Sequence, residues 1–189
     1  MQDGAKQATT KRLKLRDRLF PEAQPIVFDT SNRATKGYSQ VPRVVPLVAR
    51  LINDIGGTAN AGPLYQVLWA QDWGQGIVEV RSFRGLLYEA GYNGKGTRVE
   101  RTWQERIKIL VDKGFIRTAK RGLDEHAFVL LVDPHIAVMK LESALLKAPE
   151  QKVFDLWFPE FRTVAEQWGV DLDEYRARVA GERQAAVAT

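Results

Sequence analysis

The stretch Thr102-Trp-Gln-Glu-Arg-Ile-Lys-Ile-Leu-Val-Asp-Lys-Gly-Phe-Ile-Arg117 joins a helical pattern to a strand pattern. At about 100° per residue, large apolar side chains fall within about one third of the helix circumference. These residues are Val99, Trp103, Ile107 and Leu110. The face that they form is predicted to pack against the core, so the opposite face is predicted to point toward solvent.

Signals at both ends set the limits of this helix. The S/T-x-x-E pattern of a capping box occurs twice, at Thr97 with Glu100 and at Thr102 with Glu105. Gly114 is typical of a helix end, so the helix is predicted over about residues 97–113. The run 115–118 beyond it is predicted to be a strand.

The chain on either side of this stretch contains further elements. Apolar residues at helical spacing, with proline near the start and glycine near the end, predict helices at 44–55 and from 63 to near 74. A short strand is predicted at 77–80, and Ser82 is placed to cap a helix over 83–90. A second strand-like run, 127–132, is predicted to pair with 115–118 in a hairpin. Further helices are predicted after Pro134 and Pro149.

Together these elements predict a mostly α fold with a small β-hairpin wing. The chain divides into a basic arm over 1–36, a domain with a leading helix over 37–133, and a C-terminal helical segment over 134–189. The arm is rich in polar residues and is predicted to be partly disordered. The last residues, 181–189, have little apolar surface to bury and are predicted to fray.

The order of elements from residue 60 to residue 132 resembles a winged helix-turn-helix domain, in which a two-stranded wing comes after the recognition helix. Within it, 102–117 resembles the end of the recognition helix and the first wing strand of bacterial regulators and of plasmid replication or partition proteins. The glycine-rich turn at 91–96 is longer than is usual between the paired helices. The resemblance implies that the helix over 97–113 enters the major groove of double-stranded DNA.

The outer face of this helix carries side chains of the types that read base edges. Arginine pairs with guanine, glutamine pairs with adenine, and glutamate accepts a hydrogen bond from cytosine. The loop 93–96 brings backbone N–H groups to a helix N-terminus, where they can bind phosphate, and the wing 119–126 adds cations. The candidate DNA contacts are Lys95, Arg98, Arg101, Gln104, Glu105, Lys108, Arg117, Lys120 and Arg121.

Charge is distributed unevenly along the chain. The 189 residues have a net charge of +5, and residues 93–121 hold nine basic side chains against three acidic ones. Residues 149–183 hold five basic and eight acidic side chains. A polyanion is therefore expected to bind 93–121 rather than the C-terminal segment. Aromatic residues between 154 and 168 make 150–175 the candidate surface for a homodimer or a protein partner.

The predicted function is sequence-specific binding of double-stranded DNA. In the cell this would serve transcription regulation, or the replication initiation or partition of a plasmid or mobile element. The alternative is a protein-interaction adaptor that uses the winged helix as a scaffold and the aromatic C-terminal segment as its contact surface.

Other classes of function lack support in the sequence. The chain has no cysteine, and its two histidines do not have the spacing of a metal site, so no metal is predicted. The glycines at 91, 94 and 96 match neither nucleotide-binding signature, so no cofactor is predicted. No catalytic set is evident, and an enzyme is not predicted. No apolar run approaches the roughly 18–20 residues of a membrane span, and a cytoplasmic protein is predicted.

Overall fold

The computed structural model describes residues 10, 14–19, 39–94 and 96–187. The chain divides into two compact units, Met1–Tyr38 and Ser39–Thr189. Within the arm predicted over 1–36, residues 14–19 are helical, and Arg16 forms an ion pair with Asp17 at 2.8 Å. Apart from Thr10, the rest of that arm lies outside the described residues, so the structure does not test the prediction that the arm is partly disordered.

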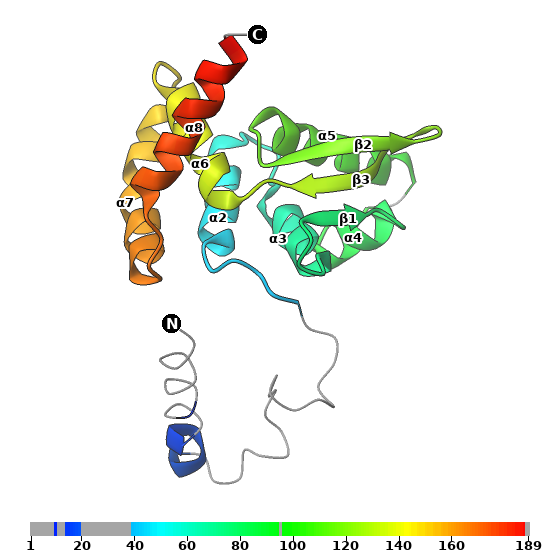
Figure 1. The fold of residues 1–189 in the computed structure, drawn as a ribbon. Helices are drawn as coiled ribbons and strands as arrows, with labels where there is room; N and C mark the ends of the chain where they lie inside the picture. The colour runs from blue at the N-terminus through cyan, green and yellow to red at the C-terminus, as the bar shows by residue number, and fades with distance from the viewer. Residues whose placement is uncertain (1–9, 11–13, 20–38, 95, 188–189) are drawn as a thin grey trace. The chain divides into compact units, whose positions relative to one another are not determined.

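The larger unit is mostly helical and contains one small antiparallel sheet, which confirms the predicted fold class (Figure 1). Its elements are α2 (Val45–Ile55), α3 (Gly62–Gln71), β1 (Ile77–Glu79), α4 (Phe83–Glu89), α5 (Thr97–Asp112), β2 (Ile116–Arg121), β3 (Asp124–Leu131), α6 (Pro134–Leu145), α7 (Gln151–Gln167) and α8 (Leu172–Val187). The strand order is β1-β3-β2, so β3 pairs with both of the others. Helix α5 lies behind the sheet in Figure 1, and the other sheet face is turned toward the viewer.

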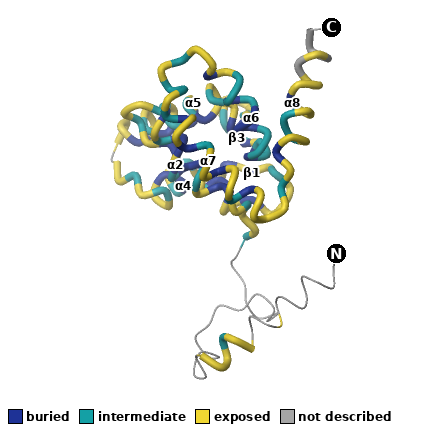
Figure 2. Tube along the Cα trace, turned by 90° about the vertical axis from the view of Figure 1, so that its left-hand side faces the viewer, coloured by how far each residue is buried: buried dark blue, intermediate teal, exposed yellow. Residues whose placement is uncertain are grey.

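Helix α5 buries the face that the sequence predicts. Val99, Trp103, Ile107 and Leu110 are all buried, which confirms the assignment of the inner face. The Trp103 ring lies 5.9 Å from that of Phe83 of α4. Figure 2 shows buried positions along the inward sides of the helices, and Ala180, Gly181 and Glu182 of α8 are exposed.

Helices α2 and α3 approach each other closely at Gly62. The Gly62 N–H donates to Asn53 Oδ1 at 2.7 Å, and a Cβ at this position would overlap the carbonyl oxygen of Ala49. Only a residue without a side chain fits here, because the obstacle is backbone rather than a flexible side chain.

The aromatic segment of α7 packs mainly against its own chain. Its buried aromatic members are Phe154, Trp157 and Phe161. The Trp157 indole N–H donates to the carbonyl oxygen of Leu47 in α2, at 3.0 Å. At the surface of this segment are Leu156, 84% exposed, and Trp168, 48% exposed.

The start of α5 differs from the capping-box prediction. The helix begins at Thr97, but its N-cap residue is Gly96, and no side chain caps it. Glu100 instead forms an ion pair with Arg84 of α4, at 3.1 Å. A capping box needs the glutamate to turn back to the first residues, and this tertiary contact holds the carboxylate elsewhere.

Two element boundaries also differ from the sequence predictions. The hairpin strands are longer than predicted and pair as far as Arg121 with Asp124, which leaves Gly122 and Leu123 as the tip. Side-chain polarity does not reveal this pairing, because both faces of the hairpin are solvent-exposed there. Helix α8 continues through Val187, into the residues from 181 onward that were predicted to fray. This end of the helix is rich in strong helix formers.

Asp133 joins the sheet to the C-terminal helices as the N-cap of α6. Its Oδ1 accepts hydrogen bonds from the backbone N–H of His135 at 2.8 Å and from the ring Nδ1 of His135 at 3.0 Å. Burial raises the pKa of this carboxyl, but the hydrogen bonds from His135 outweigh that effect and leave the pKa below its ordinary value. The ionised cap therefore stabilises the folded chain.

Replacing Asp133 with alanine is expected to lower the free energy of unfolding by about 1 kcal/mol at neutral pH, the usual effect of losing a cap. A carboxyl whose pKa is lower in the folded state stabilises the fold at any pH above its unfolded-state pKa. This stabilisation is lost as the pH falls through the folded-state pKa. The difference between wild type and variant should therefore shrink below about pH 4. Urea denaturation at several pH values measures it. The exposed Asp54, in a long 4.0 Å ion pair with Arg50, provides the control Asp54→Ala. A difference that grows on acidification would contradict the assignment.

Candidate nucleic-acid interface

The outer face of α5 is the surface predicted to contact DNA. Arg98 is exposed there, and Arg101 forms an ion pair with Glu105 at 2.8 Å. One turn further on, Lys108 pairs with Asp112 at 2.7 Å. The hydrogen bond from Arg101 lowers the pKa of Glu105. Cations and carboxylates therefore alternate along this face in i,i+4 pairs.

The hairpin adjoins this face through a chain of three polar side chains. His126 of β3 contacts Gln104 of α5 through Nε2 at 3.0 Å, and Thr118 of β2 through Nδ1 at 3.2 Å. The imidazole also packs against Trp103, with ring centroids 6.5 Å apart. These contacts fix the hairpin beside α5 and hold one end of the Gln104 amide. A hollow of about 400 Å³ runs between the two elements here, with Lys108 among the residues that line it.

The N-terminus of α5 is preceded by a backbone conformation that favours glycine. Gly96 has a φ of 63°, in the left-handed region. Gly94 lies so close to Val99 that a Cβ would come within 3.0 Å of the valine side chain. The predicted phosphate contact at Lys95 lies outside the described residues.

Two of the candidate contacts lie on the other face of the sheet. Arg117 of β2 lies opposite Leu130 of β3, and both side chains are exposed. The next pair along the strands, Thr118 and Val129, points to the other face of the sheet, toward the core. Arg121 donates to Glu79 of β1 at 2.6 Å. Strand alternation thus separates Arg117 from the outer face of α5. Lys120 is exposed at the register shift beside the hairpin tip.

Two other cations of the basic stretch turn inward. Arg106 is mostly buried, with its guanidinium 5.1 Å from the centre of the Tyr92 ring. Lys113 forms an ion pair with Glu150 of the C-terminal segment at 3.3 Å. The fold therefore spreads the nine basic side chains of 93–121 over several surfaces. The structure brings Arg98, Arg101, Gln104, Glu105 and Lys108 together on one helix.

His126 contributes to this surface, although it was not among the candidate DNA contacts predicted from the sequence. The sequence feature that could have pointed to His126 is its position in the predicted hairpin, eight residues after Thr118. Only the register, which aligns β3 with β2, places the imidazole against Gln104.

Comparison of the chain with models of known protein families, with curated proteins and with solved structures finds no match. Among the described residues, no group of three or more histidine, aspartate or glutamate side chains is arranged to hold a metal ion. No described helix combines the length and apolar character needed to cross a membrane.

Proposed function

We propose that the segment from α3 to β3 is a winged helix-turn-helix unit that binds double-stranded DNA and reads its sequence with the outer face of α5. The observation that carries the proposal is the burial of Trp103, which turns Arg98 and Arg101 outward beside a two-stranded hairpin. A helix presented in this way can enter a major groove, and the hairpin can contact the adjacent backbone. Control of transcription, or of the replication or partition of a plasmid, is the corresponding cellular role.

The ion pairs on α5 can be exchanged for contacts to DNA. Arg101 and Lys108 are 82% and 74% exposed, so their ion pairs lie in water. Exposed ion pairs of this kind are weak because water screens them, whereas a bidentate contact to guanine contributes about 1–3 kcal/mol. Glu105 and Asp112 also offset part of the positive charge of this face. The pairing tunes this surface for selectivity rather than for indiscriminate attraction to phosphate.

The test begins with selection of bound sequences from random duplex DNA at near-physiological salt. Arg101→Ala is expected to weaken the preferred sequence by about 1–3 kcal/mol and to relax the preference at one base pair. Lys120→Ala is expected to weaken all sequences alike and to reduce the slope of log affinity against log salt by about 0.9. The exposed Lys152 of the acidic segment provides the control Lys152→Ala, which should change neither.

The position of Arg117 allows a further comparison. Because this residue lies on the opposite side of the sheet, Arg117→Ala should reduce affinity less than Lys120→Ala does. Unchanged affinity in both Arg101→Ala and Lys120→Ala at low salt would overturn the proposal. Enrichment of inverted repeats would show that two copies bind together, for which Leu156 and Trp168 are the exposed apolar residues of 150–175.

A further inference from the structure

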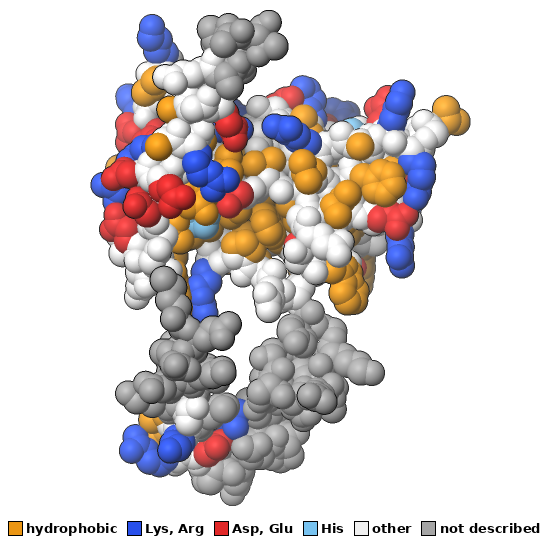
Figure 3. Space-filling model, in the orientation of Figure 1, with side chains coloured by type: hydrophobic (Ala, Val, Ile, Leu, Met, Phe, Trp, Pro, Cys, Tyr) orange, Lys and Arg blue, Asp and Glu red, His pale blue; other side chains and the backbone are white. Residues whose placement is uncertain are grey.

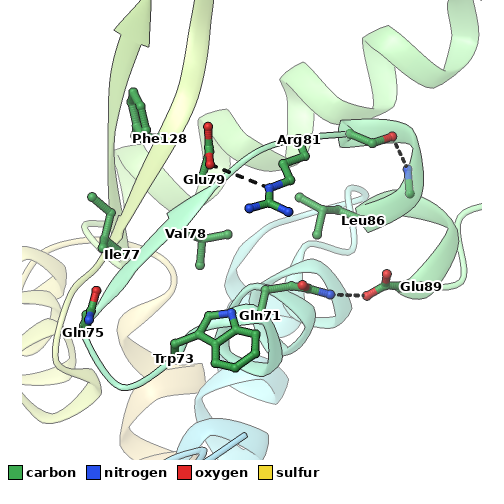
Figure 4. A pocket seen from close by; sticks show the side chains of 12 residues that line it. Gln71, Trp73, Gln75, Ile77, Val78, Glu79, Arg81, Leu86, Glu89 and Phe128 are labelled. Carbon is green, nitrogen blue, oxygen red and sulfur yellow. Dashed lines mark hydrogen bonds and ion pairs between the residues drawn. The ribbon is translucent and has the colours of Figure 1, made fainter. Parts of the chain in front are cut away.

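A groove runs along the free edge of β1, between this strand and helix α4. It has a volume of about 590 Å³, and its wall residues include Trp73, Val78, Arg81, Leu86 and Phe128. Figure 4 shows the Arg81 side chain lying across the hollow, between Glu79 of β1 and Leu86 of α4. The groove shares no lining residue with the outer face of α5, so the two are separate surfaces.

The backbone of β1 presents unpaired groups to this groove. Leu131 N–H donates to Gly76 carbonyl, and Val80 N–H donates to Ala127 carbonyl, on either side of the pair formed by Val78 with Val129. In an antiparallel ladder, alternate residues face the partner strand. The N–H and C=O groups of Ile77 and Glu79 therefore point to the free edge, where no described strand pairs with β1.

The side chains around this edge offer apolar contacts. Val78 and Leu86 are 4% and 6% exposed and form the floor of the groove, while Trp73 at its rim is 92% exposed. On the outer face of the sheet, Ile77 and Leu130 are 46% and 44% exposed. Figure 3 shows apolar side chains gathered over the strands on this face. A large exposed indole beside an apolar hollow is typical of an interface anchor.

The charges at the two ends of the groove are of opposite sign. At one end, Glu79 lies between two guanidinium groups, 2.6 Å from Arg121 and 3.7 Å from Arg81, which leaves one positive charge in excess. Arg81 is the more exposed of the two, at 87%. At the other end, the carboxylate of Glu89 accepts a hydrogen bond from Gln71 at 2.8 Å. A strand that carries a carboxylate at the Arg81 end matches this arrangement.

We propose that this groove binds an extended peptide segment of a partner protein by strand addition to β1. The peptide backbone pairs with Ile77 and Glu79, alternate apolar side chains contact Trp73 and the floor of the groove, and an acidic side chain pairs with Arg81. A groove between an edge strand and a helix suits one strand, because main-chain hydrogen bonds supply affinity and the hollow selects side chains.

The test is selection from a displayed library of random decapeptides with the full chain as bait, followed by synthesis of the enriched sequences. Alternating β-branched residues with an acidic residue at one end are expected. Ile77→Pro removes an outward N–H and keeps the ladder to β3. We expect this variant, Trp73→Ala and Arg81→Glu each to weaken the peptides by at least about tenfold. Tyr88 is 75% exposed on α4 and does not line the groove, so Tyr88→Ala is the matched control and should bind normally.

Three results would overturn the proposal: no enrichment above bare support, enriched peptides that bind all three variants unchanged, or enriched peptides whose amides tolerate N-methylation throughout. Thermal unfolding of each variant shows that it is folded. Light scattering tests whether a second copy of the chain occupies the groove instead of a peptide. If the chain self-associates, and if Trp73→Ala and Arg81→Glu abolish this self-association, the groove is assigned to a second copy. The DNA affinity of Ile77→Pro and Trp73→Ala, two variants that change no charge, should be the same as that of the wild type, which keeps this test apart from that of the α5 surface.

Discussion

Replacing Trp103 with alanine is expected to lower the free energy of unfolding by about 3–5 kcal/mol, the range measured for large aromatic side chains removed from a core. The indole is 4% exposed and contacts the rings of Phe83 and His126, so its loss leaves a cavity between α4, α5 and the hairpin. Urea denaturation followed by far-UV circular dichroism measures the change. The midpoint should fall while the dependence on urea concentration stays the same.

Trp73→Ala is the matched control, because that indole is 92% exposed. Its effect should lie within about 0.5 kcal/mol of zero, as for most surface substitutions. A loss below about 1 kcal/mol for Trp103→Ala would place that residue outside the core. The assignment of Arg98 and Arg101 to an outward face would then fail as well.

Gly62→Ala is expected to lower the free energy of unfolding by about 1–3 kcal/mol, although alanine is the better helix former. The added methyl group would overlap the carbonyl oxygen of Ala49 and press on Asn53, whose side chain accepts the Gly62 N–H. Helices α2 and α3 must separate to admit it. Differential scanning calorimetry and urea denaturation report the change.

The chain contains a second helical glycine at which substitution by alanine should have the opposite effect on the free energy of unfolding. Gly181 lies within α8, and nothing stands within 4 Å of the place a Cβ would occupy. Gly181→Ala should therefore raise stability by up to about 1 kcal/mol, because it removes backbone freedom from the unfolded chain. Equal effects at the two positions would show that helix propensity, not the approach of α2 to α3, decides the result at Gly62.

The helices were predictable because their information is local. The spacing of Val99, Trp103, Ile107 and Leu110 sets the inner face of α5, and Gly114 ends the helix with a φ of 78°. The Ser82 cap was also predictable, and its Oγ accepts the Gly85 N–H at 3.1 Å.

The composition of the candidate interface was less predictable, because it depends on partners far along the chain. Counting charge over 93–121 treats every cation as available, yet Lys113 is held by Glu150 and Arg121 by Glu79. The face on which Arg117 lies is set by strand register, which depends on backbone pairing. The same holds for Glu100, which was assigned to a cap and instead contacts Arg84.

The long sequence separation between α2 and the helices that cover it affects how the chain folds during translation. Its apolar residues pack against α3, which comes soon after it, and also against α6 and α7, including the contact of Leu47 with Trp157. During synthesis at the ribosome, one side of this early helix must wait for more than a hundred further residues before it can be covered. The apolar side of α2 that faces α7 therefore stays exposed to solvent through most of translation, and exposed apolar surface of this kind makes a nascent chain prone to aggregation.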